Sequence, residues 1–278
     1  DTEGNNLAIG RDALGGSING GETNIAIGNY SLDANTSGDR NVALGYVALT
    51  QNSTGTFNVA IGNGASQLNS SGSSNTSLGN NSMYSNTSAN YNTAIGAEAL
   101  YDVARTSDTD GYNTALGYNA GNTGTNDITT GNKNTLLGAS TAASAAAGTN
   151  QTVIGFGASG TADNSVTIGN SSVTAWYPGS DDTADLGSNS VEFKDLYIDG
   201  TANLDAVDID GGAIDGSAIG ANSASTGAFT TITASTSLDV TGSTGIILEN
   251  DETITNSTDT QINICLLYTS DAADDVVR

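Results

Sequence analysis

The chain repeats a five-residue pattern: an Asn, an aliphatic residue or Thr, a usually small residue, Ile or Leu, and a Gly. Ten copies end at Gly10, Gly28, Gly45, Gly62, Gly79, Gly96, Gly117, Gly138, Gly155 and Gly169. These glycines are separated by 18, 17, 17, 17, 17, 21, 21, 17 and 14 residues. A nearly constant period is typical of one structural unit stacked on copies of itself. We therefore predict an all-β solenoid over residues 1–173, with about ten coils of 14–21 residues.

The three residues before each glycine alternate as in a β-strand, for example Val59, Ala60 and Ile61. Since neighbouring strand side chains point to opposite faces, Val59 and Ile61 share one face. We expect that face to form the packed seam of the solenoid. The small residue on the opposite face permits close approach of another backbone, so the strand is expected to be buried on both sides.

Each repeat glycine suits a corner at which a positive φ or a close neighbour excludes a Cβ. After two variable residues, a small residue and an apolar residue follow, as in Ala13-Leu14, Ser31-Leu32, Ala48-Leu49, Ser82-Met83 and Ala99-Leu100. We interpret this pair as a second short strand of the coil. The two 21-residue intervals predict extra loops at Thr106–Asp110 and around Thr123–Gly131.

An amide side chain stands four residues before nearly every repeat glycine. The column consists of Asn6, Asn24, Asn41, Asn58, Asn75, Asn92, Asn113 and Asn134, with Gln151 in the next repeat. Stacked amides can hydrogen-bond from coil to coil, as in ladders of repetitive β structures. The alternative is that these amides are presented to a ligand.

The composition adds a constraint on stability and on partners. Only 36% of residues are hydrophobic and 5% aromatic, a composition usually found in disordered chains, yet the apolar residues are regularly placed. Because each coil has few apolar side chains, we expect other copies of the chain to contribute to stability. The formal charge of −24, from 30 acidic and 6 basic residues, argues against nucleic acid and anionic membranes as partners.

Candidate chemistry is sparse. The chain has no histidine, which excludes Ser-His-Asp catalysis and histidine-based metal sites. Paired carboxylates catalyse glycoside hydrolysis in many glycosidases. The candidates near the first long interval are Glu98 with Asp102 and Asp108 with Asp110. No aromatic platform or second long loop accompanies them, so we expect no enzyme activity and no cofactor.

Several other residues are candidates for metal, glycosylation, ice-binding or receptor sites. Asp205, Asp208 and Asp210 before Gly211 loosely resemble a calcium loop without its further ligands, so we expect no metal site. The Asn52 and Asn69 sequons follow from composition. The threonine row from Thr76 to Thr152 suggests an ice-binding face, but it shares a face with aliphatic residues and is expected to be packed or half-buried. Contact points for a receptor stay unknown; Arg11, Tyr30, Tyr46 and Tyr118 are turn residues that suit either contact or simple solvent exposure.

The repeats resemble a known pattern. Residues 58–62 (NVAIG), 92–96 (NTAIG) and 164–169 (NSVTIG) look like the head repeat of trimeric autotransporter adhesins, and phage tail fibres carry similar repeats. The resemblance covers residues 5–173 and implies a left-handed parallel β-roll with two short strands per coil, assembled as a homotrimer. The period of 17 exceeds the family's usual 14 to 15, so longer turns are expected.

The second part of the chain resembles phage proteins more closely. Two segments, residues 185–200 (DLGSNSVEFKDLYIDG) and 219–233, are similar to sequence motifs of tail fibres. The first of these motifs is often found upstream of an endosialidase-type chaperone domain. We expect a β-rich shaft or connector over residues 174–264. Residues 265–278 resemble a translated sequencing adapter and are expected to be a non-native tail, which includes the single cysteine, Cys265. The chain begins with Asp and has no signal peptide, so its true N-terminus is expected to be missing.

Together these features predict a fragment of a phage tail fibre, non-enzymatic and homotrimeric. It would lie on the virion and mediate or space binding to a glycan or protein receptor of the host surface. One alternative is the head or stalk of a trimeric autotransporter adhesin on a bacterial surface. A remoter one is a tailspike that degrades glycans.

Overall fold

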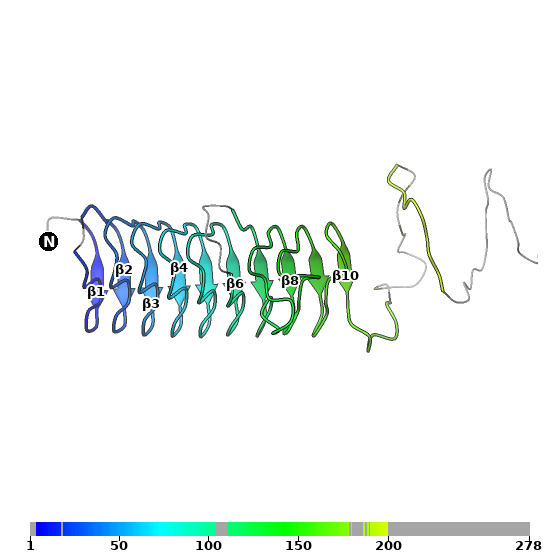
Figure 1. Cartoon of the computed structure of the whole chain (residues 1–278), viewed down its shortest axis with the longest axis horizontal. Helices are drawn as coiled ribbons and strands as arrows, with labels where there is room; N and C mark the ends of the chain where they lie inside the picture. The colour runs from blue at the N-terminus through cyan, green and yellow to red at the C-terminus, as the bar shows by residue number, and fades with distance from the viewer. Residues whose placement is uncertain are drawn as a thin grey trace, which may run out of the picture. The chain divides into compact units, whose positions relative to one another are not determined.

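The computed structural model describes residues 4–17, 19–103, 110–177, 179, 186, 188 and 190–199. Within this part, one parallel sheet contains ten three-residue strands in sequence order (Figure 1). They are β1 (Leu7–Ile9), β2 (Ile25–Ile27), β3 (Val42–Leu44), β4 (Val59–Ile61), β5 (Thr76–Leu78), β6 (Thr93–Ile95), β7 (Thr114–Leu116), β8 (Thr135–Leu137), β9 (Thr152–Ile154) and β10 (Val166–Ile168). The prediction of an all-β parallel solenoid is confirmed.

The chain divides into two compact units, Asp1–Phe193 and Lys194–Arg278. The first contains the solenoid, and only residues 194–199 of the second are described. Most of the shaft predicted over 174–264 therefore lies outside the described residues. The predicted tail over 265–278 and the acidic triplet Asp205, Asp208 and Asp210 lie outside them entirely.

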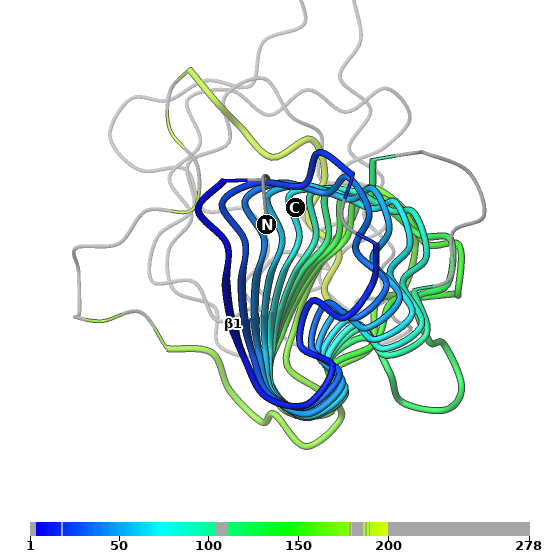
Figure 2. The same cartoon turned by 90° about the vertical axis from the view of Figure 1, so that its left-hand side faces the viewer.

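Successive coils stack with equivalent residues directly in line. Ile25 pairs with Val42, Ala26 with Ala43 and Ile27 with Leu44, and the same register continues through the sheet. Seen end-on, the coils follow one another with the same outline, each slightly offset from the last, and the strands form one side of the cross-section (Figure 2). Each residue type of the repeat therefore forms a column along the solenoid.

The face of the strand that points inward is the opposite of the expected one. From β2 to β9 the central strand residue is fully buried: Ala26, Ala43, Ala60, Ser77, Ala94, Ala115, Leu136 and Val153. The first and third residues share a face, as predicted, but that face points outward and stays partly exposed. The prediction that it forms the packed seam, with strands buried on both sides, is wrong for the single chain. Six of these eight inward residues are Ala or Ser, and only β8 and β9 contribute the larger Leu136 and Val153.

The second strand expected in each coil is absent from the described repeats. The small and apolar pair lies in a turn, and the apolar residue has a left-handed backbone: φ is 49° at Leu32, 50° at Leu49, 48° at Met83 and 49° at Leu100. This conformation is incompatible with an extended strand. The turn directs these side chains into the coil, where all four are fully buried and supply the bulk that the alanines lack.

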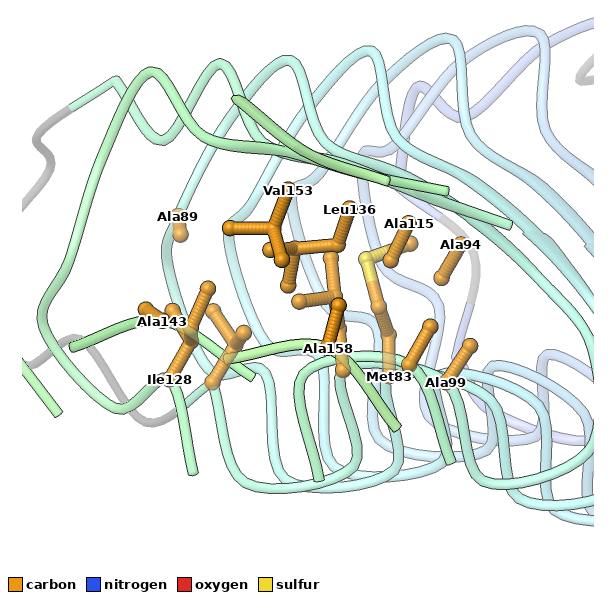
Figure 3. Close-up of a cluster of buried hydrophobic side chains, with 13 residues drawn as sticks. Met83, Ala89, Ala94, Ala99, Ala115, Ile128, Leu136, Ala143, Val153 and Ala158 are labelled. Atoms are coloured by element: carbon orange, nitrogen blue, oxygen red, sulfur yellow. The ribbon is translucent and has the colours of Figure 1, made fainter. Parts of the chain in front are cut away.

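The interior contains two apolar clusters. One includes Leu32 and Leu49 with the alanines of β2 to β4, and the other extends from Met83 to Ala158. Figure 3 shows Met83, Leu136 and Val153 of the second cluster within the space enclosed by the coils. Ile128, from the interval predicted to hold an extra loop around Thr123–Gly131, also enters this cluster. The loop is therefore anchored by its own apolar side chain.

A pair of serines separates the two clusters. Ser66 stands in the column of Leu49 and Met83, and Ser77 stands in the column of Ala60 and Ala94. Both are buried, and the Ser66 hydroxyl donates a 2.9 Å hydrogen bond to the Ser77 hydroxyl. The hydrogen bond satisfies two polar groups that would otherwise be costly to bury.

The repeat glycines meet both conditions that the sequence suggested. Gly62 has φ of 140°, and a Cβ there would collide with the carbonyl oxygen of Gly79 and lie 2.6 Å from its carbonyl carbon. The backbone of one coil therefore rests directly on the backbone of the next. Any side chain at this corner would push the coils apart.

Substitution Gly62→Ala is expected to destabilise the solenoid by at least about 3 kcal/mol, because it adds a backbone clash to an unfavourable φ. Gly124→Ala is the matched control: Gly124 also has a positive φ, 82°, but its Cβ would meet nothing within 4 Å. That control is expected to cost only about 1 kcal/mol. Urea unfolding followed by circular dichroism measures both, and equal losses would contradict the contact between coils.

The serine pair predicts a non-additive mutant cycle. Ser77→Ala leaves the Ser66 hydroxyl without its main partner and is expected to cost about 1–2 kcal/mol. Ser66→Leu with Ser77→Ala restores the residues found in neighbouring coils and is expected to stabilise the protein by about 1–2 kcal/mol. Chemical denaturation of these two variants and of Ser66→Leu alone tests this, and an additive cycle would show that the two hydroxyls do not interact.

Candidate assembly and adhesion surface

An aliphatic stripe follows the outside of the sheet over its whole length. It consists of the third residue of every strand: Ile9, Ile27, Leu44, Ile61, Leu78, Ile95, Leu116, Leu137, Ile154 and Ile168. We call this column the outer stripe. The neighbouring column, from the first strand residues, is aliphatic in β1 to β4, Thr in β5 to β9 and Val in β10.

The outer stripe is exposed to a degree unusual for such side chains. Leu44, Leu78, Leu116 and Leu137 retain 42–43% of their accessible surface. In the adjacent column Thr114 and Thr135 are exposed, and the other three threonines are half-buried. A continuous apolar surface of this kind marks an interaction site in soluble proteins. The packing expected for this face is not supplied by the part of the chain that the structure describes.

The stripe is kept straight by a ladder of buried amides inside the coils. Asn41 donates from its Nδ2 to Asn24 Oδ1 at 3.1 Å and to the Gly55 carbonyl at 2.9 Å. Its backbone N–H also donates to Asn24 Oδ1, at 2.9 Å. The same pattern continues through Asn134, so the predicted ladder is confirmed. These asparagines are almost fully buried, so the alternative that they present amides to a ligand is wrong.

A second amide ladder runs beside the first. Asn52 donates to Asn35 Oδ1 at 3.1 Å, Asn69 to Asn52 at 2.8 Å and Asn86 to Asn69 at 2.9 Å. Asn52 and Asn69 begin glycosylation sequons, but both follow the repeat glycine by seven residues, as Asn35 and Asn86 do, and this spacing is the signal of the ladder. Their side chains are buried, which is incompatible with glycosylation of the folded protein.

The first ladder ends at Gln151 and Asp163. The backbone N–H of Gln151 still donates to Asn134 Oδ1, but its side-chain amide turns to Ser144 and to Asp163 Oδ1, at 2.7 and 3.0 Å. Asp163 also accepts a 2.8 Å hydrogen bond from the Thr149 N–H. These hydrogen bonds, that from Thr149 above all, lower the pKa of Asp163. A carboxylate therefore terminates the column of amides.

The acidic residues that were candidates for paired catalytic carboxylates have other neighbours than the predicted ones. Burial, with the charge of Asp127, raises the pKa of Asp102. The Asp127 carboxylate comes from the second long interval, a neighbour that the sequence did not suggest for Asp102. Asp110 instead accepts a 2.9 Å hydrogen bond from the Tyr112 hydroxyl, and Asp108 lies outside the described residues. Among described residues, no three acidic, Cys or His side chains form a group that could hold a metal ion.

Three of the four suggested contact residues do meet. The Arg11 guanidinium lies 4.5 Å from the Tyr30 ring centroid and donates to the Tyr30 hydroxyl, and Tyr30 meets Tyr46 edge-to-face at 6.1 Å. Tyr118 is exposed but belongs to none of the ring pairs of the described chain. Two further pairs of rings are stacked, Tyr84 with Tyr101 and Tyr91 with Tyr112, and the sequence did not predict them. Each pair occupies equivalent positions in consecutive coils, which is the signal that could have revealed it.

Comparison with protein-family models and with curated proteins finds no match to this chain. The described residues include no helix of the length and apolarity needed to cross a membrane. Function therefore has to be inferred from the surfaces just described. The outer stripe is the largest of them, and the exposed rings are the most chemically distinctive.

The ladder end predicts a pH-dependent stability. A carboxylate whose pKa is lowered by folding stabilises the folded state at every pH above its ordinary, unfolded-state pKa, which is near 4. This stabilisation is lost as the pH falls through the lowered, folded-state pKa. Asp163→Asn is therefore expected to melt at a lower temperature than the parent at pH 7, with the gap closing below about pH 4. Asp33→Asn, at a carboxylate without a hydrogen bond in the described chain, is the control. Thermal melts between pH 7 and 2 measure this, and a gap independent of pH would contradict the role of Asp163.

Proposed function

We propose that the chain is a segment of a homotrimeric, non-enzymatic phage tail fibre that mediates or spaces attachment to a host cell. The observation that carries the proposal is the outer stripe. Ten coils in one register present ten Ile or Leu side chains on one outward face. A second and third copy of the same chain, placed around a common axis parallel to the stripe, offer that face an equally long and matching surface.

The energy of such an assembly is adequate. Removing the exposed part of one Leu or Ile side chain, which is about half or less, from water contributes up to about 1 kcal/mol. The ten residues of the stripe therefore contribute up to about 10 kcal/mol per protomer. Association costs about 4–15 kcal/mol in lost translational and rotational freedom. Repetition along the stripe is therefore what makes association favourable, since one or two coils would not suffice.

The attachment role is supported by the resemblance of the repeats at 58–62, 92–96 and 164–169 to adhesin heads and tail fibres. The resemblance of residues 185–200 to tail-fibre phrases favours a location on the virion, outside any cell. A host-surface glycan or protein is then the receptor. Three parallel copies give each weak contact a threefold repetition, which raises overall avidity.

Analytical ultracentrifugation tests the assembly. The parent chain is expected to sediment as a trimer at micromolar concentration. The double substitution Leu44→Asp and Leu78→Asp places two carboxylates in the outer stripe, so it is expected to weaken association at least a hundredfold while the β-sheet circular dichroism spectrum persists. Tyr46→Asp is the matched control, because Tyr46 is equally exposed but lies beyond the strand, outside the stripe.

A parent chain that remains monomeric, or a stripe variant that remains trimeric, would contradict the proposal. The attachment role is tested by adding the fluorescently labelled trimer to a panel of bacteria, where saturable binding to a subset of strains is expected. Release of reducing ends from the surface polysaccharides of those strains would instead identify a glycan-degrading tailspike.

A further inference from the structure

A second outward column lies just before the buried amide ladder. Between the third and the eighth coil it consists of Arg40, Phe57, Ser74, Tyr91, Tyr112 and Lys133. We call it the ring column. All six residues have a left-handed backbone, with φ between 49° and 60°. Because they share one backbone conformation in stacked coils, their side chains leave the solenoid in the same direction.

The rings of this column lie flat across the stacking direction. Tyr91 and Tyr112 are stacked, with centroids 5.1 Å apart and planes inclined by 4°, which matches the spacing of consecutive coils. At the other end, the Arg40 guanidinium lies over the Phe57 ring, 5.3 Å from its centroid. Phe57 therefore also presents one face to the preceding coil and the other to the following one.

Ser74 interrupts this stack. The coil between Phe57 and Tyr91 has a two-atom side chain where its neighbours have rings. By the coil spacing, the ring planes of Phe57 and Tyr91 are therefore two coil spacings apart. Twice the 5.1 Å ring separation is about 10 Å. The far face of each ring is covered, by Arg40 or by Tyr112, while 53% of Phe57 and 50% of Tyr91 remain exposed. We call the space between them the Ser74 slot.

The width of the Ser74 slot favours a puckered ring. Carbon atoms pack best at about 3.5–4.0 Å, so a flat ring between two walls fills only about 7–8 Å. A chair-shaped sugar has thickness of its own and C–H groups on both sides, and it fits the remaining space more closely. The Ser74 hydroxyl has no hydrogen bond within the described chain, and its backbone N–H donates to Thr56. A free hydroxyl is thus available at the floor of the slot for a sugar hydroxyl.

We propose that the Ser74 slot binds one uncharged hexopyranose ring of a host-surface polysaccharide, sandwiched between Phe57 and Tyr91. An uncharged sugar is favoured because the chain carries 30 acidic and 6 basic residues and repels polyanions. The inference rests on the proposed attachment role and assigns it a contact site. In the trimer the slot occurs three times, so weak single-ring contacts act together.

The test uses the whole chain and a set of neutral pentasaccharides built from glucose, galactose, mannose or N-acetylglucosamine, with a sialylated and a uronic-acid pentasaccharide added. Saturation-transfer NMR and calorimetry measure binding. Ser74→Tyr completes the ring stack and fills the slot, so it is expected to weaken binding of the neutral ligand at least tenfold. Tyr91→Ala removes one wall and is expected to weaken it by about tenfold.

The matched control is Asn150→Tyr, which adds a tyrosine to the same column at φ of 51° but four coils beyond Ser74. Its affinity is expected to equal that of the parent. The slot proposal is overturned if no neutral pentasaccharide binds the parent, if only the acidic ones bind, or if Ser74→Tyr binds as well as the parent. It is also overturned if Ser74→Tyr changes the sedimentation of the trimer, since the slot would then be a contact between protomers.

The same samples separate this inference from the proposed function. If the trimers adsorb to bacteria but bind no pentasaccharide, the proposed fibre role stands and the Ser74 slot proposal is contradicted. If the chain binds a neutral pentasaccharide through the Ser74 slot but sediments as a monomer, the slot proposal stands and the fibre proposal is contradicted.

Discussion

Direct contact between the backbones of consecutive coils is the constraint on which this structure depends. At the repeat corners from Gly10 to Gly138 the glycine of one coil lies against the carbonyl of the next, which fixes how closely and in which register the coils stack. The two amide ladders add hydrogen bonds at the same spacing, and the Gly55 carbonyl accepts from Asn41 of one ladder and Asn52 of the other. Register is thereby fixed from inside, independently of the outer surface.

That tight stacking leaves a narrow interior, and the narrowness determines what the outside looks like. Alanines on most strands and one larger residue from most turns fill the space, while β8 and β9 contribute Leu136 and Val153. The first and third residues of each strand point outward and line the exterior. The outer stripe gains one Ile or Leu with every coil, so a longer solenoid presents a proportionally longer apolar face. The association energy of the proposed homotrimer would therefore grow with repeat number.

Because register is set internally, the outward columns can vary from coil to coil without harming the fold. Tyrosines at equivalent positions of neighbouring coils stack on one another, because the coil spacing is close to the stacking distance of aromatic rings. A small residue in such a row becomes a gap with ring walls. Binding sites in a solenoid of this kind can thus arise from single substitutions on an unchanged scaffold.

The sequence alone determined the period, the position of each strand, the repeat glycines and the first amide ladder, because each of these repeats a residue type at one spacing. It could not decide which strand face points inward. Alternation of Val59, Ala60 and Ile61 defines two faces equally well, and the choice depends on the width of the coil. The sequence also could not show that Leu49 and Met83 adopt left-handed turns, since such residues rarely do so without surrounding contacts. The second ladder, the Asp102 and Asp127 neighbours and the Ser74 slot join residues 17 to 34 positions apart. Only the stacking of coils brings them together.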